Sequence, residues 1–306
     1  MRGSNLYAVE SIDYGGGPGA SRRSAKIQEI ESFVMVETFA LAGGAATSVR
    51  SSPDLATASA ALPAGAYTTL RTYGGDGVPF LDDHARRLEE SATLQGRPGN
   101  IDRALLRTGL AAVLQATRHP ESRIRVTFAP PDLFASVEPF VPLPESLYED
   151  GAWCVTVPLQ REKPQSKDTR FLSSARGAYQ NLPAGVHEGL LVAEDGALLE
   201  GLSSNVFAVV DGVLRTEDAR ALHGTTRALV LELARGILPV SLEALRKADF
   251  GRAAEVFLTS VSREVLGVVR VDDVTIGRGK PGALAKELRK RYRARMRSVA
   301  EHLLRR

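Results

Sequence analysis

Residues 189–216 read GLLVAEDGALLEGLSSNVFAVVDGVLRT, and this stretch predicts two β-hairpins in succession. The turns are expected at residues 195–196 and residues 211–212, where Asp is followed by Gly between runs of β-forming residues. An Asp-Gly pair in that setting is the strongest short-range signal for a hairpin. Helical spacing begins after Gly224, in TTRALVLELARG. Strands that run in hairpins, with helices between clusters of them, predict an α+β fold and not a doubly wound sheet.

Upstream of these hairpins, the sequence predicts a first region of strands and helices. A strand with its turn is expected in FVMVETFALAG from Phe33, and a hairpin is expected from AYTTLRTY (66–73) into VPFL. Asp82 or Asp83 is expected to cap a helix through HARRLEESATLQG. A second helix is expected over residues 101–117, followed by strands in SRIRVTF and FASVEPF.

The Pro-rich segment PFVPLPESLYEDG predicts a boundary between two domains. We expect a flexible tail over residues 1–30, a small N-terminal domain over residues 31–147 and a larger C-terminal domain over residues 148–306. Within the larger domain, strands are expected in WCVTVPL and EVFLTS, and a further helix is expected in SLEALRKA (241–248).

The composition is that of an ordinary globular protein, with 43% hydrophobic and 25% charged residues among 306. The single cysteine, Cys154, excludes an internal disulfide and Cys-rich zinc sites, and its apolar context AWCVTV predicts a buried packing residue. No apolar stretch approaches the roughly 20 residues of a membrane span. The N-terminus also lacks the apolar core of a signal peptide. We therefore expect a soluble, cytoplasmic protein.

The basic character of the chain is concentrated at its C-terminus. The net charge is +3, but residues 284–306 contain nine Lys and Arg against two Glu, a net of +7, so the rest of the chain carries −4. This segment predicts a docked helix with a solvated basic face, and because no nucleic-acid-binding module accompanies it, we expect no nucleic-acid partner. The apolar residues at helical spacing are Leu284, Leu288, Tyr292, Met296, Val299, Leu303 and Leu304.

Four groups of polar residues are candidates for chemistry, and each has an ordinary structural alternative. Glu200 stands at a strand end before the tight turn that Gly201 allows, and spacing alone leaves open whether it is only the polar end of that strand. Thr225 and Thr226 stand where a helix begins and where its free N–H groups favour a phosphate, or where a threonine simply caps the helix. Lys167 lies in a charged loop, where most lysines are only solvated. The fourth group is a rim of hydroxyls, Thr259, Ser260 and Ser262.

Taken together, these segments resemble the class IV, fold-type IV pyridoxal-phosphate enzymes, which include branched-chain and D-amino-acid aminotransferases and aminodeoxychorismate lyase. EGLSSNVF is similar to the E-G-x-x-S-N-x-F block of this family, HGTTRALVLELA to its G-[IT]-T-R helix start, and IGRGKPG to its closing G-x-G-x-x-G. AAEVFLTSVSREVLGVVRVD resembles the E-x-F-x-T-S…E-x-x-P-V block, with Gly267 in place of Pro. AYTTLRTYGGDGVPFLDDHARRLEESATLQG resembles the F-E-T-x-R…H-x-x-R-L-x-x-S-A block, and the five matches follow the family order between residues 62 and 292.

The resemblance implies a two-domain fold, with a small sandwich-like N-terminal α/β domain and a larger C-terminal domain that has a β-barrel-like core flanked by helices. It implies pyridoxal 5'-phosphate (PLP) as cofactor and Lys167 as the catalytic lysine that binds it covalently, because Lys167 precedes Glu200 by the 33 residues that the family spacing requires. Lys163 is the competitor, but Pro164 and the spacing count against it. Burial and nearby cations would lower the pKa of such a lysine and make its amine nucleophilic.

For Glu200, the resemblance implies a place against the pyridine nitrogen, where a carboxylate keeps the ring protonated. Arg87 is expected to bind the cofactor phosphate, with Arg86 as its neighbour without that role. Arg125 and Tyr67 fall near substrate positions. The further residues expected at the cofactor are Ser204, Asn205, Thr225, Thr226, Val261 and Ser262.

Two positions depart from the family pattern. Leu172 stands five residues after Lys167, where many aminotransferases have a tyrosine that contacts the cofactor, and Val261 stands where a phosphate-binding threonine is expected. The leading hypothesis is an aminotransferase acting on branched-chain or other small amino acids and 2-oxo acids. YTTLR and the missing tyrosine favour the alternative of an aminodeoxychorismate-lyase-like enzyme that releases pyruvate, and a non-catalytic relative is the third possibility. The resemblance also implies a homodimer.

Overall fold

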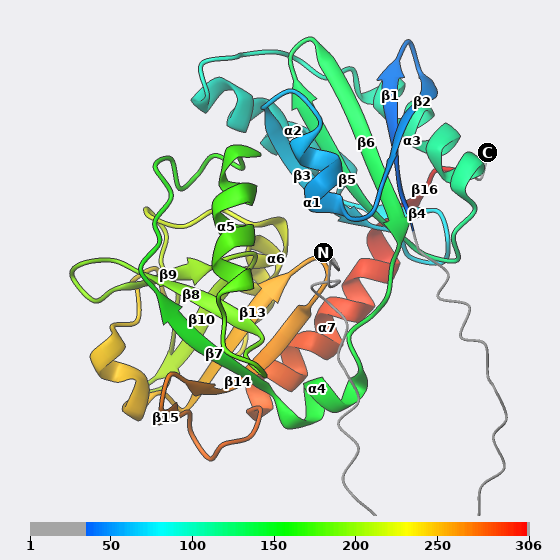
Figure 1. Ribbon diagram of the computed structural model, residues 1–306. Helices are drawn as coiled ribbons and strands as arrows, with labels where there is room; N and C mark the ends of the chain where they lie inside the picture. Colours follow the sequence, from blue (N-terminus) through cyan, green and yellow to red (C-terminus); the bar gives the residue numbers. More distant parts are fainter. Residues whose placement is uncertain (1–34, 305–306) are drawn as a thin grey trace, which may run out of the picture.

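The computed structural model describes residues 35–304, so the tail expected over residues 1–30 lies outside the described residues. Helices and strands are mixed along the chain, and strands pair mainly with their neighbours in hairpins, which confirms the α+β prediction. Figure 1 shows two lobes, each built on its own sheet. No helix among the described residues is both long and apolar enough to cross a bilayer.

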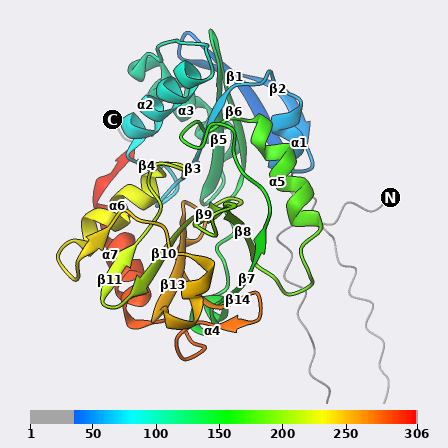
Figure 2. The same cartoon turned by 90° about the vertical axis from the view of Figure 1, so that its left-hand side faces the viewer.

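The N-terminal lobe is built on a five-stranded antiparallel sheet with its helices on the faces (Figures 1 and 2). Its apolar core lies between the sheet and helices α2 and α3, where residues such as Leu88, Leu110 and Ile124 are almost completely buried. The strands, in sheet order, are β2 (Ala45–Ser52), β1 (Val36–Ala42), β6 (Asp132–Pro139), β5 (Ser122–Ala129) and β3 (Ala66–Arg71). The helices are α1 (Leu55–Ala60), α2 (Leu81–Leu94) and α3 (Arg103–Thr117).

The C-terminal lobe is built on a nine-stranded mixed sheet, covered by helices α6 (Thr225–Ala234) and α7 (Ala283–Val299). A second layer, with helix α5 (Arg170–Gln180), packs against the β8 and β9 end of the sheet and lies beside α1 of the other lobe (Figure 2). The strands, in sheet order, are β12 (Val240–Ser241), β11 (Val213–Arg215), β10 (Asn205–Val210), β13 (Glu255–Ser260), β14 (Glu264–Val271), β7 (Ala152–Val157), β8 (Glu188–Val192) and β9 (Leu198–Gly201), with β15 (Val274–Thr275) paired to β14.

The basic C-terminal segment is a docked helix, as predicted, but the helix ends at Val299. Leu288, Tyr292 and Met296 point into the core of the C-terminal lobe. The chain then forms β16 (Ala300–His302), which pairs with β4 (Gly77–Pro79) of the N-terminal lobe. The last element therefore crosses the division expected at residues 147 and 148 and joins the two lobes.

Both Asp-Gly hairpins are confirmed, because β8 pairs with β9 and β10 pairs with β11 around the expected turns. The predicted hairpin from residues 66–73 into VPFL is wrong. β3 pairs with β5, and β4 instead receives β16 from the far end of the sequence, so only one bridge, between Tyr73 and Gly77, remains of the expected pairing.

Two further local predictions are wrong for identifiable reasons. The segment 241–248 is not an α-helix, because the turn between β8 and β9 takes its backbone groups: the Leu198 N–H donates to the Leu245 carbonyl at 2.7 Å and the Lys247 N–H to the Gly196 carbonyl at 2.8 Å. A 3₁₀ helix, η1 (Lys247–Arg252), follows instead. The cap of α2 is Phe80, in the left-handed region, while Asp82 and Asp83 lie in the first turn, where carboxylates favour the positive end of the helix.

Candidate active site

Lys167 lies in the loop between β7 and α5, where the two lobes meet. Its backbone is fixed by the N-terminal lobe, because its N–H donates to Ser91 Oγ at 3.1 Å and its carbonyl accepts from the Tyr67 N–H at 2.9 Å. Its amine lies 4.6 Å from the centre of the Tyr67 ring. The competitor Lys163 is exposed and donates to the Leu94 carbonyl at the surface. The structure therefore separates the two lysines, and only Lys167 reaches the interior.

The environment of Lys167 favours a neutral amine. Burial is the first cause that lowers the pKa of Lys167 well below its ordinary value, and Arg87 and Arg161 lower it further, while Glu200 opposes them. The side chain keeps some exposed surface, so the amine is accessible as well as desolvated. A neutral, accessible lysine amine is a nucleophile toward an aldehyde.

Glu200 is buried at the end of β9, with 2% of its surface exposed. One carboxylate oxygen lies 2.6 Å from Arg161 Nε, and the other accepts from the Leu222 N–H at 3.1 Å. Arg161 also stacks its guanidinium 3.6 Å from the centre of the Phe171 ring. Sequence reasoning missed Arg161, because its charged loop, QREKPQSKDTR, has the composition of a solvated segment.

Arg87 projects from α2 toward the same interior region and stands apart from its neighbour Arg86, which is exposed and pairs with Asp83 and Glu90. Arg87 Nη2 donates to Thr68 Oγ1 at 2.5 Å. Burial lowers the pKa of Arg87 to about 10. Among the described residues, its Nε is a buried N–H group without a hydrogen-bond partner. A buried, under-paired guanidinium is suited to bind an anion.

The start of α6 provides a second set of donors for an anion. Thr225 and Thr226 form the first turn, and Gly224 before them offers no side-chain cap, so the N–H groups of that turn are open to a ligand. Asn205 fixes the approach to this helix, because its Nδ2 donates to the Leu222 carbonyl at 2.7 Å. Gly224 is required here, since a Cβ atom would lie 2.4 Å from Asn205 Oδ1.

Val261 and Ser262 lie in the short turn between β13 and β14, and both are half-buried. This turn is adjacent to the turn after Glu200, because β10 and β13 pair with Asn205 opposite Thr259. The predicted cofactor residues of the C-terminal lobe therefore come from three segments at one end of its sheet: the β9–β10 turn, the start of α6 and the β13–β14 turn.

Ser204 turns toward the protein interior and meets an acid that the sequence did not suggest. Its hydroxyl donates to Glu188 Oε2 at 2.9 Å. Glu188 is completely buried at the start of β8 and also pairs with Arg263 at 3.3 Å and accepts from the Tyr179 hydroxyl. The only sequence signal was a carboxylate at the head of the apolar run EGLLV, where an acid is rarely buried without partners.

The two residues expected near the substrate lie together beside Lys167. Tyr67 is buried in β3, and the Arg125 guanidinium carbon lies 5.2 Å from the centre of its ring. Arg125 also donates to the Ser59 hydroxyl at 2.8 Å and to the Leu55 carbonyl at 3.0 Å. Leu172 lies in the first turns of α5, and a tyrosine of that helix, Tyr179, lies two turns further on in the Glu188 cluster.

The family model for amino-transferase class IV matches residues 65–271, more than half of the chain. The chain belongs to this family.

Two relatives of this class IV chain align over most of their own length. A protein of Methanocaldococcus jannaschii, assigned as a branched-chain-amino-acid aminotransferase, is 30% identical over 256 residues, which cover 75% of this chain and 86% of the relative. A D-alanine aminotransferase of Bacillus licheniformis is 30% identical over 243 residues, which cover 73% and 84%. The two names differ in substrate, so the likeness establishes the family and an enzyme of the transferase class, but no particular amino acid.

Solved structures show the same fold. A branched-chain amino acid aminotransferase from T.th., solved with pyridoxamine 5'-phosphate, superimposes with a TM-score of 0.72 at 19% identity and covers 87% of this chain and 98% of that one. The 4-amino-4-deoxychorismate lyase of Pseudomonas aeruginosa gives a TM-score of 0.63 at 27% identity and covers 75% and 90%. The fold-type IV architecture expected from the sequence is confirmed.

Class IV aminotransferases use PLP, and the residues of this chain fit that cofactor. The site has an accessible lysine amine of lowered pKa, a buried carboxylate and a buried guanidinium with an unpartnered N–H, together with an uncapped helix start. These groups match, in turn, an aldehyde, a ring nitrogen and a phosphate. The cations around Lys167 outnumber Glu200, which is the charge balance that a phosphate ester requires.

Proposed function

We propose that this protein is a PLP-dependent aminotransferase that moves an amino group between a small or branched-chain α-amino acid and a 2-oxo acid. The observation that supports this most directly is Lys167, an interior amine whose pKa is lowered by burial and by Arg87 and Arg161. The reaction balances without any further reagent, because one amino acid becomes a 2-oxo acid as the other 2-oxo acid becomes an amino acid.

Each residue has a chemical task in this proposal. When bound, PLP supplies an aldehyde for covalent attachment and a ring that accepts electron density from the substrate α-carbon. The Lys167 amine attaches the cofactor and, once an amino acid has displaced it, moves the proton at the α-carbon. Glu200 holds the proton on the ring nitrogen, and Arg161 keeps the Glu200 carboxylate ionised and oriented.

The phosphate is held from both lobes. Arg87 of the N-terminal lobe supplies the guanidinium, and the C-terminal lobe supplies the N–H groups of Thr225 and Thr226 and the backbone of the turn with Val261 and Ser262. Ser204 and Asn205 shape the neighbouring segments through Glu188 and the Leu222 carbonyl. Arg125, close to Tyr67 and Lys167, is the candidate for the substrate carboxylate.

Replacing Lys167 tests the proposal, with Lys163 as the matched control. The purified wild type should show the visible absorbance of lysine-bound PLP, and borohydride reduction should fix one cofactor on the peptide that contains Lys167. Lys167→Ala should lose both signals, with transamination reduced by at least about 100-fold, whereas Lys163→Ala should keep them. A reducible covalent link that persists in Lys167→Ala would contradict the assignment of this lysine.

A second candidate function is an aminodeoxychorismate-lyase-like reaction on the same site. Leu172 in place of the family tyrosine, the segment YTTLR and the likeness to the Pseudomonas aeruginosa lyase favour it. Incubation with aminodeoxychorismate, with pyruvate and p-aminobenzoate as the measured products, separates the two reactions. A spectral change with a panel of L- and D-amino acids instead supports the aminotransferase, and no response to any substrate supports the non-catalytic alternative.

The homodimer and the cytoplasmic location remain predictions from the sequence. Sedimentation of the purified protein, at concentrations on both sides of the expected dissociation range, tests the first of them.

A further inference from the structure

Glu264 occupies a backbone conformation that its own chemistry disfavours. It follows the turn at residues 261–263 and begins β14, with a φ of 57° in the left-handed region. Residues with a Cβ atom seldom adopt this region, and glycine is the residue that short hairpin turns favour at such a position. A glutamate at this point requires an explanation in its side chain.

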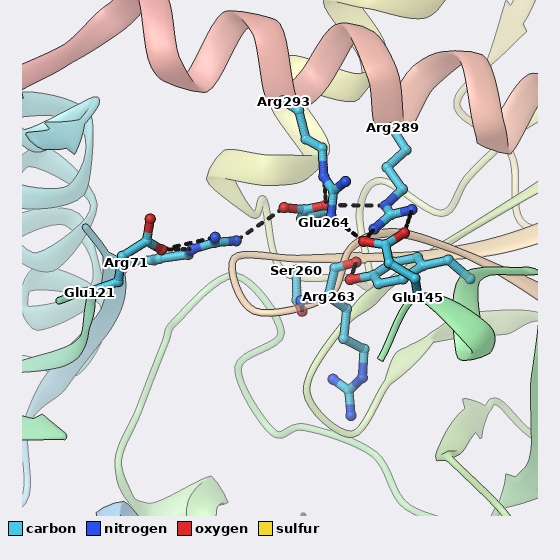
Figure 3. A network of polar contacts seen from close by, with 9 residues as sticks. Arg71, Glu121, Glu145, Ser260, Arg263, Glu264, Arg289 and Arg293 are labelled. Carbon is cyan, nitrogen blue, oxygen red and sulfur yellow. Dashed lines mark hydrogen bonds and ion pairs between the residues drawn. The ribbon is translucent and has the colours of Figure 1, made fainter. Parts of the chain in front are cut away.

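The Glu264 carboxylate is buried and bonded to three guanidinium groups (Figure 3). One oxygen lies 3.0 Å from Arg71 Nη1, and the other lies 3.2 Å from Arg289 Nε and 2.6 Å from Arg293 Nε. Only 3% of the Glu264 side chain is exposed. Three charge-assisted hydrogen bonds to one buried carboxylate can hold the residue in a strained backbone conformation.

These partners belong to different parts of the molecule. Arg71 ends β3 in the N-terminal lobe, whereas Arg289 and Arg293 lie on α7 against the C-terminal lobe. Glu264 is therefore a carboxylate of one lobe held by a guanidinium of the other, at the base of the turn that contains Val261 and Ser262. Figure 3 shows the neighbouring Arg263 pointing the opposite way, where it pairs with Glu188.

Each guanidinium keeps another carboxylate of its own. Arg71 also pairs with Glu121 at 3.0 Å, and Arg289 and Arg293 also pair with Glu145 at 2.7 Å and 3.1 Å. Removing Glu264 therefore leaves no arginine of the group without an acid, so neutralising the arginines does not by itself explain the presence of Glu264. What only Glu264 provides is the link between Arg71 and the β13–β14 turn.

We propose that Glu264 is a positioning residue that fixes the β13–β14 turn to the N-terminal lobe, so that its backbone and Arg87 hold the phosphate of the cofactor together. This inference rests on the proposed function, because it takes residues 261–262 and Arg87 as the two sides of one phosphate site. It predicts that loss of the Glu264–Arg71 link weakens the grip on the phosphate and leaves the attachment of the aldehyde to Lys167 intact.

The test compares PLP with pyridoxal, which has the aldehyde and the ring but no phosphate. Full-length protein stripped of cofactor is titrated with each compound, and covalent attachment is followed by absorbance. Glu264→Gly should raise the apparent Kd for PLP by at least about tenfold and change that for pyridoxal by less than about twofold. Arg71→Met, which breaks the link from the other lobe, should repeat this pattern. Glu121→Gln removes the other acid of Arg71 without touching the turn and should leave both affinities unchanged.

The outcomes separate this inference from the proposed function. Failure of the wild type to attach PLP refutes the proposed function. An unchanged PLP affinity in Glu264→Gly and Arg71→Met refutes the positioning role, and so does an equal loss for PLP and pyridoxal, which would indicate general loosening of the site. Because glycine relieves the backbone at this position, a purely local role in the turn predicts a Glu264→Gly protein at least as stable as the wild type, with full affinity. If Glu264→Gly does not fold, Arg71→Met decides by the same comparison.

Discussion

The two turns that meet at the candidate site, residues 202–204 and residues 261–263, are neighbours in the sheet but obtain their shapes from different sources. In the first turn, Gly201 leaves room that its surroundings require, because a Cβ atom would lie 2.2 Å from Ser204 Oγ. In the second, Glu264 adopts the left-handed region although it is not glycine, and three arginines hold it there. The first turn is specified by close local packing and the second by charges from distant segments.

Glu188 connects the two turns. Its carboxylate accepts from Ser203 and Ser204 in the first turn and pairs with Arg263 in the second. Buried acids with this many partners fix geometry, since each partner loses a charged acceptor if the acid is removed. The site therefore has one local and one long-range support, with a single acid between them.

Removing the connecting charge should have the largest effect on folding. Glu188→Gln keeps the shape of the side chain but leaves the buried Arg263 guanidinium without its carboxylate, so the free energy of unfolding should fall by about 3 kcal/mol or more. Urea unfolding of the cofactor-free protein measures this. Tyr179→Phe, which removes one hydrogen bond to the same acid, should cost only about 1 kcal/mol. A Glu188→Gln protein as stable as Tyr179→Phe would show that the charge of Glu188 does not matter.

Breaking only the local support should have an intermediate effect. Gly201→Ala places a methyl group against Ser204 Oγ, and the resulting overpacking should lower the free energy of unfolding by about 1–3 kcal/mol. The control removes the clashing atom: in a Ser204→Ala background, the nearest atoms to the new methyl group are those of Glu188 at 3.1 Å, so the cost of Gly201→Ala should be smaller. Equal costs in both backgrounds would place the clash elsewhere.

How far the sequence predicted each region follows the same distinction. Local signals were sufficient for the hairpins at residues 195–196 and residues 211–212, and for the separation of Lys167 from Lys163 by spacing. They failed where a distant segment competes for backbone groups. The strand at 77–79 pairs with residues 300–302 and not with its own neighbour, which no local pattern contains.

The missed residues of the site have a common cause. Arg161, Glu188 and Glu264 are charged residues whose burial depends on partners far away in the chain, such as Arg71, which is 193 residues from Glu264. In a sequence such residues are indistinguishable from solvated ones, because a charge is buried only where its partners converge in three dimensions. The motifs located Glu200 and the start of α6, but not the charges that hold them in place.

The smallest expected effect comes from a change inside the site that touches neither turn. Lys167→Met replaces a buried amine by an apolar chain of similar length. Because the pKa of Lys167 is lowered in the folded protein, the folded state binds fewer protons than the unfolded chain between that lowered pKa and the ordinary value near 10.5. The stability of the cofactor-free wild type should therefore rise with pH across this window, and the full cost of the buried charge is present below it.

Methionine removes that cost, which is about 1.4 kcal/mol for each pKa unit of lowering. Lys167→Met should accordingly be more stable than the wild type without cofactor at neutral pH, and the difference should shrink as the pH approaches 10.5. Unfolding in urea across pH 6–10.5 measures it, and Lys163→Met, at the exposed neighbour, should stay within about 0.5 kcal/mol of the wild type throughout. A gain in stability that accompanies the loss of the attachment lysine would show that the site holds its amine in a state that folding disfavours and the chemistry requires. A constant difference across this pH range would instead mean that Lys167 keeps its ordinary pKa, and the argument for its reactivity would fall with it.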